Sequence, residues 1–320
     1  MNLLQLKQAA AKLETNHSIL IYGPPKGGKT WLAATAALIP EVKRIFFFSL
    51  ENGHETILNM DLPDWALEKI TIFKIQDTRE NPLGIETILK SLTQRGSVKI
   101  CDLHGRVDCA ECMKAKEGFT PFALSECTHF DLVIIDSGSQ LGDSALAAAC
   151  LGKPGMYKPT FDEYGMVNKW LGDACSVIQQ CVNTNFVVLT HEIALEDDEG
   201  KDRIFPLMGS KQFSMKCAKF FGTVVYVHKK LGKHVAGSGS TYRPDLLTGS
   251  RLNVKLENSK DPSMRDILIA GGVLARMAPS SPTPDPTSTG ASIETVTATQ
   301  NQPTKHLSLA ERMKLNKASS

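Results

Sequence analysis

Hydrophobic residues in this chain occur either in continuous runs or in stretches where they are spaced three and four apart. Continuous apolar runs are typical of strands buried on both faces of a parallel sheet. They predict strands at 18–23, 45–51, 70–75, 131–136, 186–190, 223–228 and 251–257. Helical spacing lies between these runs, at 29–38, 84–94 and 162–182. The alternation predicts an α/β fold, a doubly wound and mostly parallel sheet.

The composition changes after the last of these elements. We expect one folded domain over 1–278, because the following residues 279–304 are rich in Pro, Ser and Thr and offer little to bury. Such a composition predicts a disordered linker. In the tail, 305–320, Ser308 and Glu311 have the spacing of a capping box. A short helix that binds a protein partner and a frayed polar end are both compatible with this tail.

The overall charge and the apolar content say more about where the protein is located than about what it binds. The net charge of +2 neither requires nor excludes nucleic acid, because binding depends on a local basic patch. The chain shows no secretory signal pattern and no apolar run as long as a membrane span. We therefore expect a cytoplasmic protein with no membrane partner. Reduced, buried thiols are expected at the four scattered cysteines, Cys150, Cys175, Cys181 and Cys217.

The segment GPPKGGKT, residues 23–30, carries the most specific chemical signal. It fits G-x-x-x-x-G-K-[ST], follows a predicted strand and opens a predicted helix, which is the setting of a phosphate-binding P-loop. Backbone N–H groups and the helix N-terminus would surround the phosphates of ATP. Lys29 would reach the β- and γ-phosphates, and Thr30 would hold Mg²⁺. The predicted nucleotide-binding residues are Gly23, Pro24, Pro25, Lys26, Gly27, Gly28, Lys29 and Thr30.

Three polar residues at the ends of other predicted strands complete a candidate catalytic set. Asp136 ends the apolar run DLVIID, a Walker B pattern, and would orient Mg²⁺. Ser137 follows it, so a catalytic acid must come from another strand, and Glu51 is the best candidate for a general base. His191, in VVLTHE, would sense the γ-phosphate. The alternatives are a solvent-facing Glu51 and a histidine bonded to nearby backbone.

A group of cysteines lies in an insertion, residues 97–129, between a predicted helix and the Walker B strand. Such a long connection needs something to order it. Two closely spaced ligand pairs suit a structural Zn²⁺ knuckle, Cys101 with His104 and Cys109 with Cys112. Cys127 and His129 are spare candidates for ligands. A redox Cys-x-x-Cys pair and reduced, unligated cysteines remain alternatives.

These motifs together resemble the RecA superfamily of P-loop ATPases. The resemblance rests on the P-loop, Glu51, IDSGSQL at 135–141 and LTHE at 189–192, and covers about residues 15–275. More narrowly, the chain is similar to phage-encoded minimal RecA-like ATPases that act in single-strand annealing and recombination. The resemblance implies a sheet of RecA type, ATP hydrolysis, and a homo-oligomer, ring or filament, with ATP at the subunit interface.

The resemblance also implies DNA-binding loops after the Walker B strand and after the sensor strand, here about 141–161 and 194–212. Basic residues beside aromatic ones suit the backbone and bases of single-stranded DNA. The acidic run 196–199 departs from that pattern. A third basic stretch is 228–243, in which Lys229 or Lys230 could reach the γ-phosphate of a neighbouring subunit. Ordinary solvated loops are the alternative for all three.

We therefore expect an ATPase, stimulated by DNA, that acts on single-stranded DNA in recombination, annealing or repair. One alternative is a helicase-like motor with the same fold. The other is a nucleotide-gated adaptor without significant hydrolysis, which the presence of Glu51 argues against.

Overall fold

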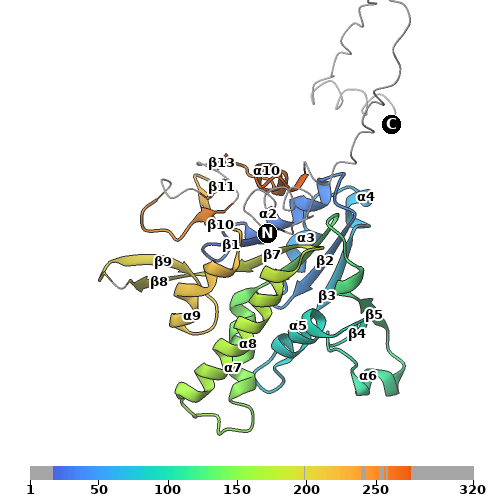
Figure 1. The fold of residues 1–320 in the computed structure, drawn as a ribbon. Helices are drawn as coiled ribbons and strands as arrows, with labels where there is room; N and C mark the ends of the chain where they lie inside the picture. Colours follow the sequence, from blue (N-terminus) through green and yellow to red (C-terminus); the bar gives the residue numbers. More distant parts are fainter. Residues whose placement is uncertain (1–16, 198, 239–242, 252–255, 257–258, 275–320) are drawn as a thin grey trace, which may run out of the picture. The chain divides into compact units, whose positions relative to one another are not determined.

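The computed structural model describes residues 17–197, 199–238, 243–251, 256 and 259–274 (Figure 1). All of them fall within the unit Met1–Pro279. The predicted linker and tail, 279–320, lie outside the described residues, as does most of the predicted strand 251–257.

Six parallel strands form the centre of the main sheet, in the order β10-β1-β7-β6-β2-β3. Each coincides with a predicted apolar run: β1 (Ser18–Tyr22), β2 (Arg44–Ser49), β3 (Ile70–Lys74), β6 (Asp131–Asp136), β7 (Asn185–Thr190) and β10 (Thr223–Lys230). Short antiparallel strands extend the β10 side, namely β11 (Lys233–Gly237), β12 (Gly249–Ser250) and β13 (Ser259–Lys260).

Helices cover both faces of this sheet (Figure 1). One face packs against α5 (Leu83–Thr93), α7 (Gly138–Ala149) and α8 (Phe161–Gln180), and the other against α2 (Lys29–Ala34) and α10 (Met264–Ala270). Side chains alternate between the two faces along β1. Leu20 and Tyr22 therefore join the hydrophobic core on the first face, and Ile19 and Ile21 join the core on the second face. The predicted fold class, a doubly wound and mostly parallel α/β sheet with a P-loop, is confirmed.

The remaining described helices are short: α3 (His54–Leu58), α4 (Asp64–Leu67), α6 (Ala110–Ala115) and α9 (Lys211–Lys216), with 3-10 turns at Thr35–Leu38, Leu124–Glu126 and Cys217–Phe220. Across the described part of the chain, no helix combines the length and the apolar character needed to span a membrane.

Two of the predicted DNA-binding loops contain helices or strands instead. Much of 141–161 belongs to α7, which Ser137 caps by accepting a hydrogen bond from the Gln140 amide. Within 194–212, β8 (Glu192–Glu196) and β9 (Asp202–Pro206) form a hairpin, followed by α9. The stretch 228–243 begins as the hairpin of β10 and β11. Loops remain at 150–160 and at the turns of the two hairpins.

The predicted insertion is a separate small unit built on an antiparallel pair, β4 (Val98–Cys101) and β5 (Phe119–Phe122), with α6 between them. One side of this unit belongs to the main core. Phe122 packs edge-on against Phe46 and Phe48, with ring centroids 5.2 and 5.3 Å apart. Hydrophobic burial therefore anchors one side of the insertion to the main core. At the end that carries the cysteines, only a small cluster of side chains is buried.

Candidate functional site

The P-loop connects β1 to α2, and its lysine is folded back onto the loop. Lys29 is buried, and its Nζ donates hydrogen bonds to the carbonyl oxygens of Gly23 (3.0 Å) and Pro24 (2.9 Å). Burial lowers the pKa of Lys29, although the nearby carboxylates of Asp136 and Glu51 act in the opposite direction. The ammonium group is thus held where phosphate oxygens could replace two carbonyl acceptors.

Thr30 and Asp136 meet next to this lysine. The Thr30 hydroxyl donates to Asp136 Oδ2 across 2.8 Å. Burial raises the pKa of Asp136 to about 6, even though the Thr30 hydrogen bond lowers it. A hydroxyl and a carboxylate at this distance are oxygen ligands of the kind that Mg²⁺ prefers. The donor set therefore fits the predicted metal, with Thr30 and Asp136 as the residues that would hold it.

Glu51, two residues after β2, contacts the side chains of Ser137 and His191, which directly follow β6 and β7. Its Oε2 lies 3.0 Å from His191 Nε2, and its Oε1 accepts a hydrogen bond from the Ser137 hydroxyl. Burial alone raises the pKa of Glu51, but the hydrogen bonds from His191 and Ser137 outweigh it, and the pKa is lowered. The carboxylate is therefore ionised at neutral pH, as a general base must be.

His191 links Glu51 to the P-loop. Its Nδ1 lies 3.3 Å from Lys29 Nζ, while Nε2 faces Glu51. An ammonium group only donates and a carboxylate only accepts, so a neutral ring with its proton on Nε2 satisfies both contacts. Lys29, His191, Glu51 and Ser137 consequently form one connected hydrogen-bonded chain. Sequence reasoning missed Ser137 as a partner of Glu51, although its position after the Walker B aspartate was visible.

These groups surround a cleft of about 550 Å³. Its walls include Lys26 to Thr30 of the P-loop, with Glu51, Asp136 and His191. Residues that were not assigned to the ATP site of their own chain also line it, among them Trp31, Lys229 and His234. Lys229, one of two residues that could reach a neighbouring subunit, thus lines the cleft of its own chain. A cleft of this size is in the range of small-molecule sites.

The four predicted zinc ligands, Cys101, His104, Cys109 and Cys112, form one cluster. Their ligand atoms all lie within 4.8 Å of one another, and the three cysteines are buried. His104 Nδ1 is 3.4 Å from the sulfur of Cys112 and 3.7 Å from that of Cys109. Two sulfurs at ~2.3 Å from a tetrahedral Zn²⁺ are about 3.8 Å apart. The cluster therefore has the donor types and the dimensions of a four-ligand zinc site.

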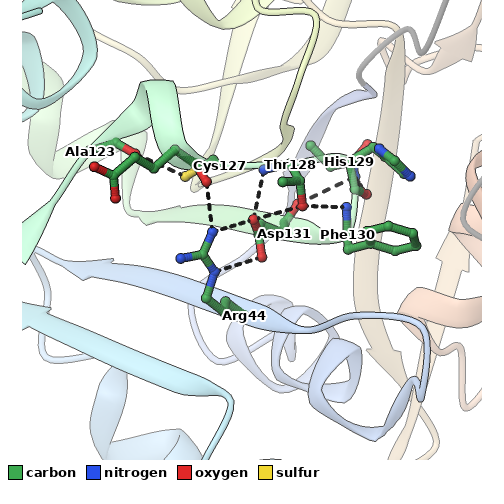
Figure 2. A network of polar contacts seen from close by, with 9 residues as sticks. Arg44, Ala123, Cys127, Thr128, His129, Phe130 and Asp131 are labelled. Atoms are coloured by element: carbon green, nitrogen blue, oxygen red, sulfur yellow. Dashed lines mark hydrogen bonds and ion pairs between the residues drawn. The ribbon is translucent and has the colours of Figure 1, made fainter. Parts of the chain in front are cut away.

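Cys127 and His129, the spare ligand candidates, lie in a different network (Figure 2). The Cys127 thiol donates to the Ala123 carbonyl across 3.5 Å, and burial raises its pKa to about 11. The His129 ring packs on Phe130, with centroids 4.0 Å apart. Neither of these spare candidates belongs to the cluster of four.

The three predicted DNA-binding stretches differ in their surfaces. Met156, in the turn between α7 and α8, and Phe161, the first residue of α8, are 95% and 96% exposed, and Lys153 lies 5.2 Å from the centre of the Tyr157 ring. In the β8–β9 hairpin, by contrast, the basic residues are paired with acids, Arg203 with Asp197 and Lys201 with Glu199. The third stretch exposes Leu231 at the tip of the β10–β11 hairpin.

Comparison with known proteins gives a family and two structural likenesses. The family described as AAA domain matches residues 15–243. No curated protein matches. Similar solved structures include the RadB recombinase, 15% identical, covering 70% of this chain and 81% of that one with a TM-score of 0.39. Another is the flagellar accessory protein FlaH from Methanocaldococcus jannaschii, 10% identical, covering 75% of this chain and 81% of that one with a TM-score of 0.36.

Proposed function

Because the chain belongs to the AAA domain family, we propose that it is an ATPase of RecA type that acts on single-stranded DNA in recombination, annealing or repair. In its narrower form the proposal is a minimal RecA-like ATPase similar to those encoded by phages. The observation that carries it is the connected chain from Lys29 through His191 to Glu51, beside the Thr30–Asp136 pair.

Each member of this hydrogen-bonded chain has a role in hydrolysis. Lys29 exchanges its carbonyl acceptors for phosphate oxygens. Glu51 orients the attacking water and accepts its proton. Thr30 and Asp136 would hold Mg²⁺, which would supply positive charge to the phosphates. His191 contacts both Lys29 and Glu51, so a change in the position of Lys29 on nucleotide binding alters the hydrogen bonding of the base.

The α7–α8 turn is the best candidate for contact with DNA. It follows α7, the helix that Ser137 caps directly after the Walker B strand. The exposed Phe161 directly after the turn, at the start of α8, offers a surface for base stacking, and Lys153 and Lys158 offer positive charge for the DNA backbone. The β8–β9 hairpin is a weaker candidate because its basic side chains are neutralised by acids. A homo-oligomer, ring or filament, belongs to the same proposal.

The ATPase proposal is tested by hydrolysis rates with and without single-stranded DNA. Wild-type protein should hydrolyse ATP faster with DNA, and Glu51→Gln should slow hydrolysis at least about 100-fold while still binding ATP. Glu68→Gln, at an exposed site on the end of α4, is the matched control. ATP binding without hydrolysis under any DNA condition would favour the adaptor. Directional unwinding of a forked duplex would favour the motor.

We also propose that Cys101, His104, Cys109 and Cys112 hold a structural Zn²⁺. The four donors leave no open coordination position, so the ion would stabilise the end of the insertion rather than take part in catalysis. Purified wild-type protein should contain about one equivalent of zinc. Cys112→Ser should lose it, whereas Cys127→Ser, another buried thiol outside the cluster, should retain it. Less than half an equivalent in the wild type would overturn this assignment.

A further inference from the structure

Two aromatic rings form one wall of the cleft beside the P-loop. Trp31 follows Thr30 on α2, and His234 reaches the same place from β11, more than 200 positions later in the chain. Their rings are stacked, with centroids 4.8 Å apart and planes inclined by 15°. Both side chains are half-buried, so each retains some surface toward the cleft.

His234 is fixed against the phosphate loop itself. Its Nδ1 lies 3.1 Å from the carbonyl oxygen of Gly27. Gly28 has a positive φ of 100°, and a Cβ there would come 2.1 Å from His234 Nδ1. A glycine is thus required at this position both for the backbone and for the close approach of the ring. The glycine at position 28 and the position of β11 therefore allow the His234 imidazole to contact the P-loop.

The triphosphate does not need this wall. Its partners would be the backbone N–H groups of the loop together with Lys29 and Thr30, which contact His191 and Asp136 rather than the two rings. Trp31 carries no charge and offers the cleft mainly a flat apolar surface. Flat π-surfaces next to a phosphate site suit a nucleobase, because every base has a π-face that stacks on aromatic side chains.

We propose that the nucleoside part of ATP packs on the stacked pair formed by Trp31 and His234. This inference rests on the proposed ATP binding and adds the residues that distinguish a nucleoside triphosphate from a bare polyphosphate. Because stacking is tolerant of base identity, the pair should accept GTP as well as ATP.

Calorimetric titration with Mg·ATP and with Mg·tripolyphosphate separates the two halves of the ligand. Wild-type protein should bind ATP more tightly than tripolyphosphate. Trp31→Leu and His234→Ala should each weaken ATP binding about tenfold, the order of magnitude of one stacking contact, and leave tripolyphosphate binding unchanged. Trp65→Leu is the matched control, because Trp65 is 48% exposed on α4 and does not line the cleft.

His234→Phe distinguishes stacking from a structural role of the ring. Phenylalanine keeps a flat ring but loses the contact with the Gly27 carbonyl, so the preference for ATP over tripolyphosphate should be retained. If His234→Ala weakens both ligands equally, His234 only supports the loop and the inference is overturned, and loss of the preference for ATP in His234→Phe would overturn it as well. An unchanged ratio of affinities in Trp31→Leu and His234→Ala also overturns it. If the wild type binds neither ligand, the ATPase proposal itself fails.

Fluorescence gives an independent readout, since the chain has three tryptophans: Trp31, Trp65 and Trp170. Excitation selective for tryptophan should show a change in emission on addition of ATP. The change should persist in Trp65→Phe and Trp170→Phe and disappear in Trp31→Phe. A change that persists in Trp31→Phe would place the nucleoside elsewhere.

Discussion

The two ends of strand β6 carry the same residue in two different settings. Asp131 begins the strand and Asp136 ends it, and they are 1% and 4% exposed. Residue type, strand and burial are therefore matched. What differs is the edge of the sheet, because Asp131 lies at the amino ends of the parallel strands and Asp136 at their carboxyl ends, beside the P-loop.

Their hydrogen-bond partners separate them further. Asp131 accepts from Arg44 Nε and Nη2 (3.0 and 2.7 Å) and from the amide and hydroxyl of Thr128 (2.7 and 3.0 Å), as Figure 2 shows. Burial raises its pKa, but the bonds from Arg44 and Thr128 outweigh it and the pKa is lowered. Asp136 has the opposite balance, and its pKa is raised. A carboxylate whose charge is already compensated stabilises the fold, whereas one that lacks compensation is suited to a cation.

The largest contrast should come from Asp136→Asn. ATP hydrolysis is expected to fall at least about 100-fold, because the carboxylate that would hold Mg²⁺ is gone. In metal-free and nucleotide-free protein at pH 7, however, the free energy of unfolding should rise by about 2 kcal/mol. A raised pKa means that the native state loses stability as the pH rises through that pKa, and asparagine removes this loss. Chemical unfolding in the presence of EDTA measures this change in the free energy of unfolding, and a variant less stable than the wild type would contradict the prediction.

Asp131→Asn should instead lower the stability and leave ATP hydrolysis unchanged. It leaves Arg44 without its carboxylate, and the free energy of unfolding should fall by about 2 kcal/mol, less than for a fully buried pair because Arg44 is half-exposed. The rate of ATP hydrolysis should be unchanged at temperatures where the variant is folded. Asp61→Asn, at an exposed position, provides the control for loss of one negative charge. Reduced hydrolysis by fully folded Asp131→Asn would show that the two edges are coupled.

The pH dependence of stability should also distinguish this variant from the wild type. The lowered pKa of Asp131 gives stability that is fully present above its unfolded value, about pH 4, and is lost as the pH falls through the folded value. Between about pH 5 and pH 2, wild-type protein should therefore lose more stability than Asp131→Asn. Denaturant unfolding at a series of pH values measures this, and parallel curves for the two proteins would assign the acid sensitivity to other groups.

The parts of the molecule that sequence reasoning predicted are the parts encoded locally. Continuous apolar runs marked the six parallel strands, and the P-loop pattern and the Walker B run marked Lys29 and Asp136. The four-residue cysteine and histidine cluster was also local, since its members fall within twelve positions. Burial on both faces of a sheet and short ligand spacings leave their signal in adjacent residues.

The contacts that were missed join distant segments. His234 lies on a short strand without an apolar run, and nothing in its neighbourhood indicates that it stacks on Trp31. The bond between Ser137 and Glu51 depends on the pairing of β2 with β6. Helix α7 was mistaken for a loop because the family resemblance implied one there, although Ser137 has the residue type of an N-cap.

The smallest effect we predict comes from Arg44→Lys, which keeps the charge opposite Asp131 but changes its shape. The guanidinium donates through Nε and Nη2 to the two carboxylate oxygens, and Nη2 also donates to the Glu126 carbonyl across 2.9 Å. A lysine ammonium is a point charge and does not reproduce this fork, so stability should fall by about 1 kcal/mol. Lys43→Ala is the control and should change stability by less than about 0.5 kcal/mol, because the exposed Lys43 side chain lies over the Phe130 ring and alanine keeps the backbone hydrogen bond to the Phe130 carbonyl. If denaturant unfolding gives Arg44→Lys the same loss as Asp131→Asn, geometry rather than charge compensates Asp131. If Arg44→Lys matches the wild type, the charge alone suffices.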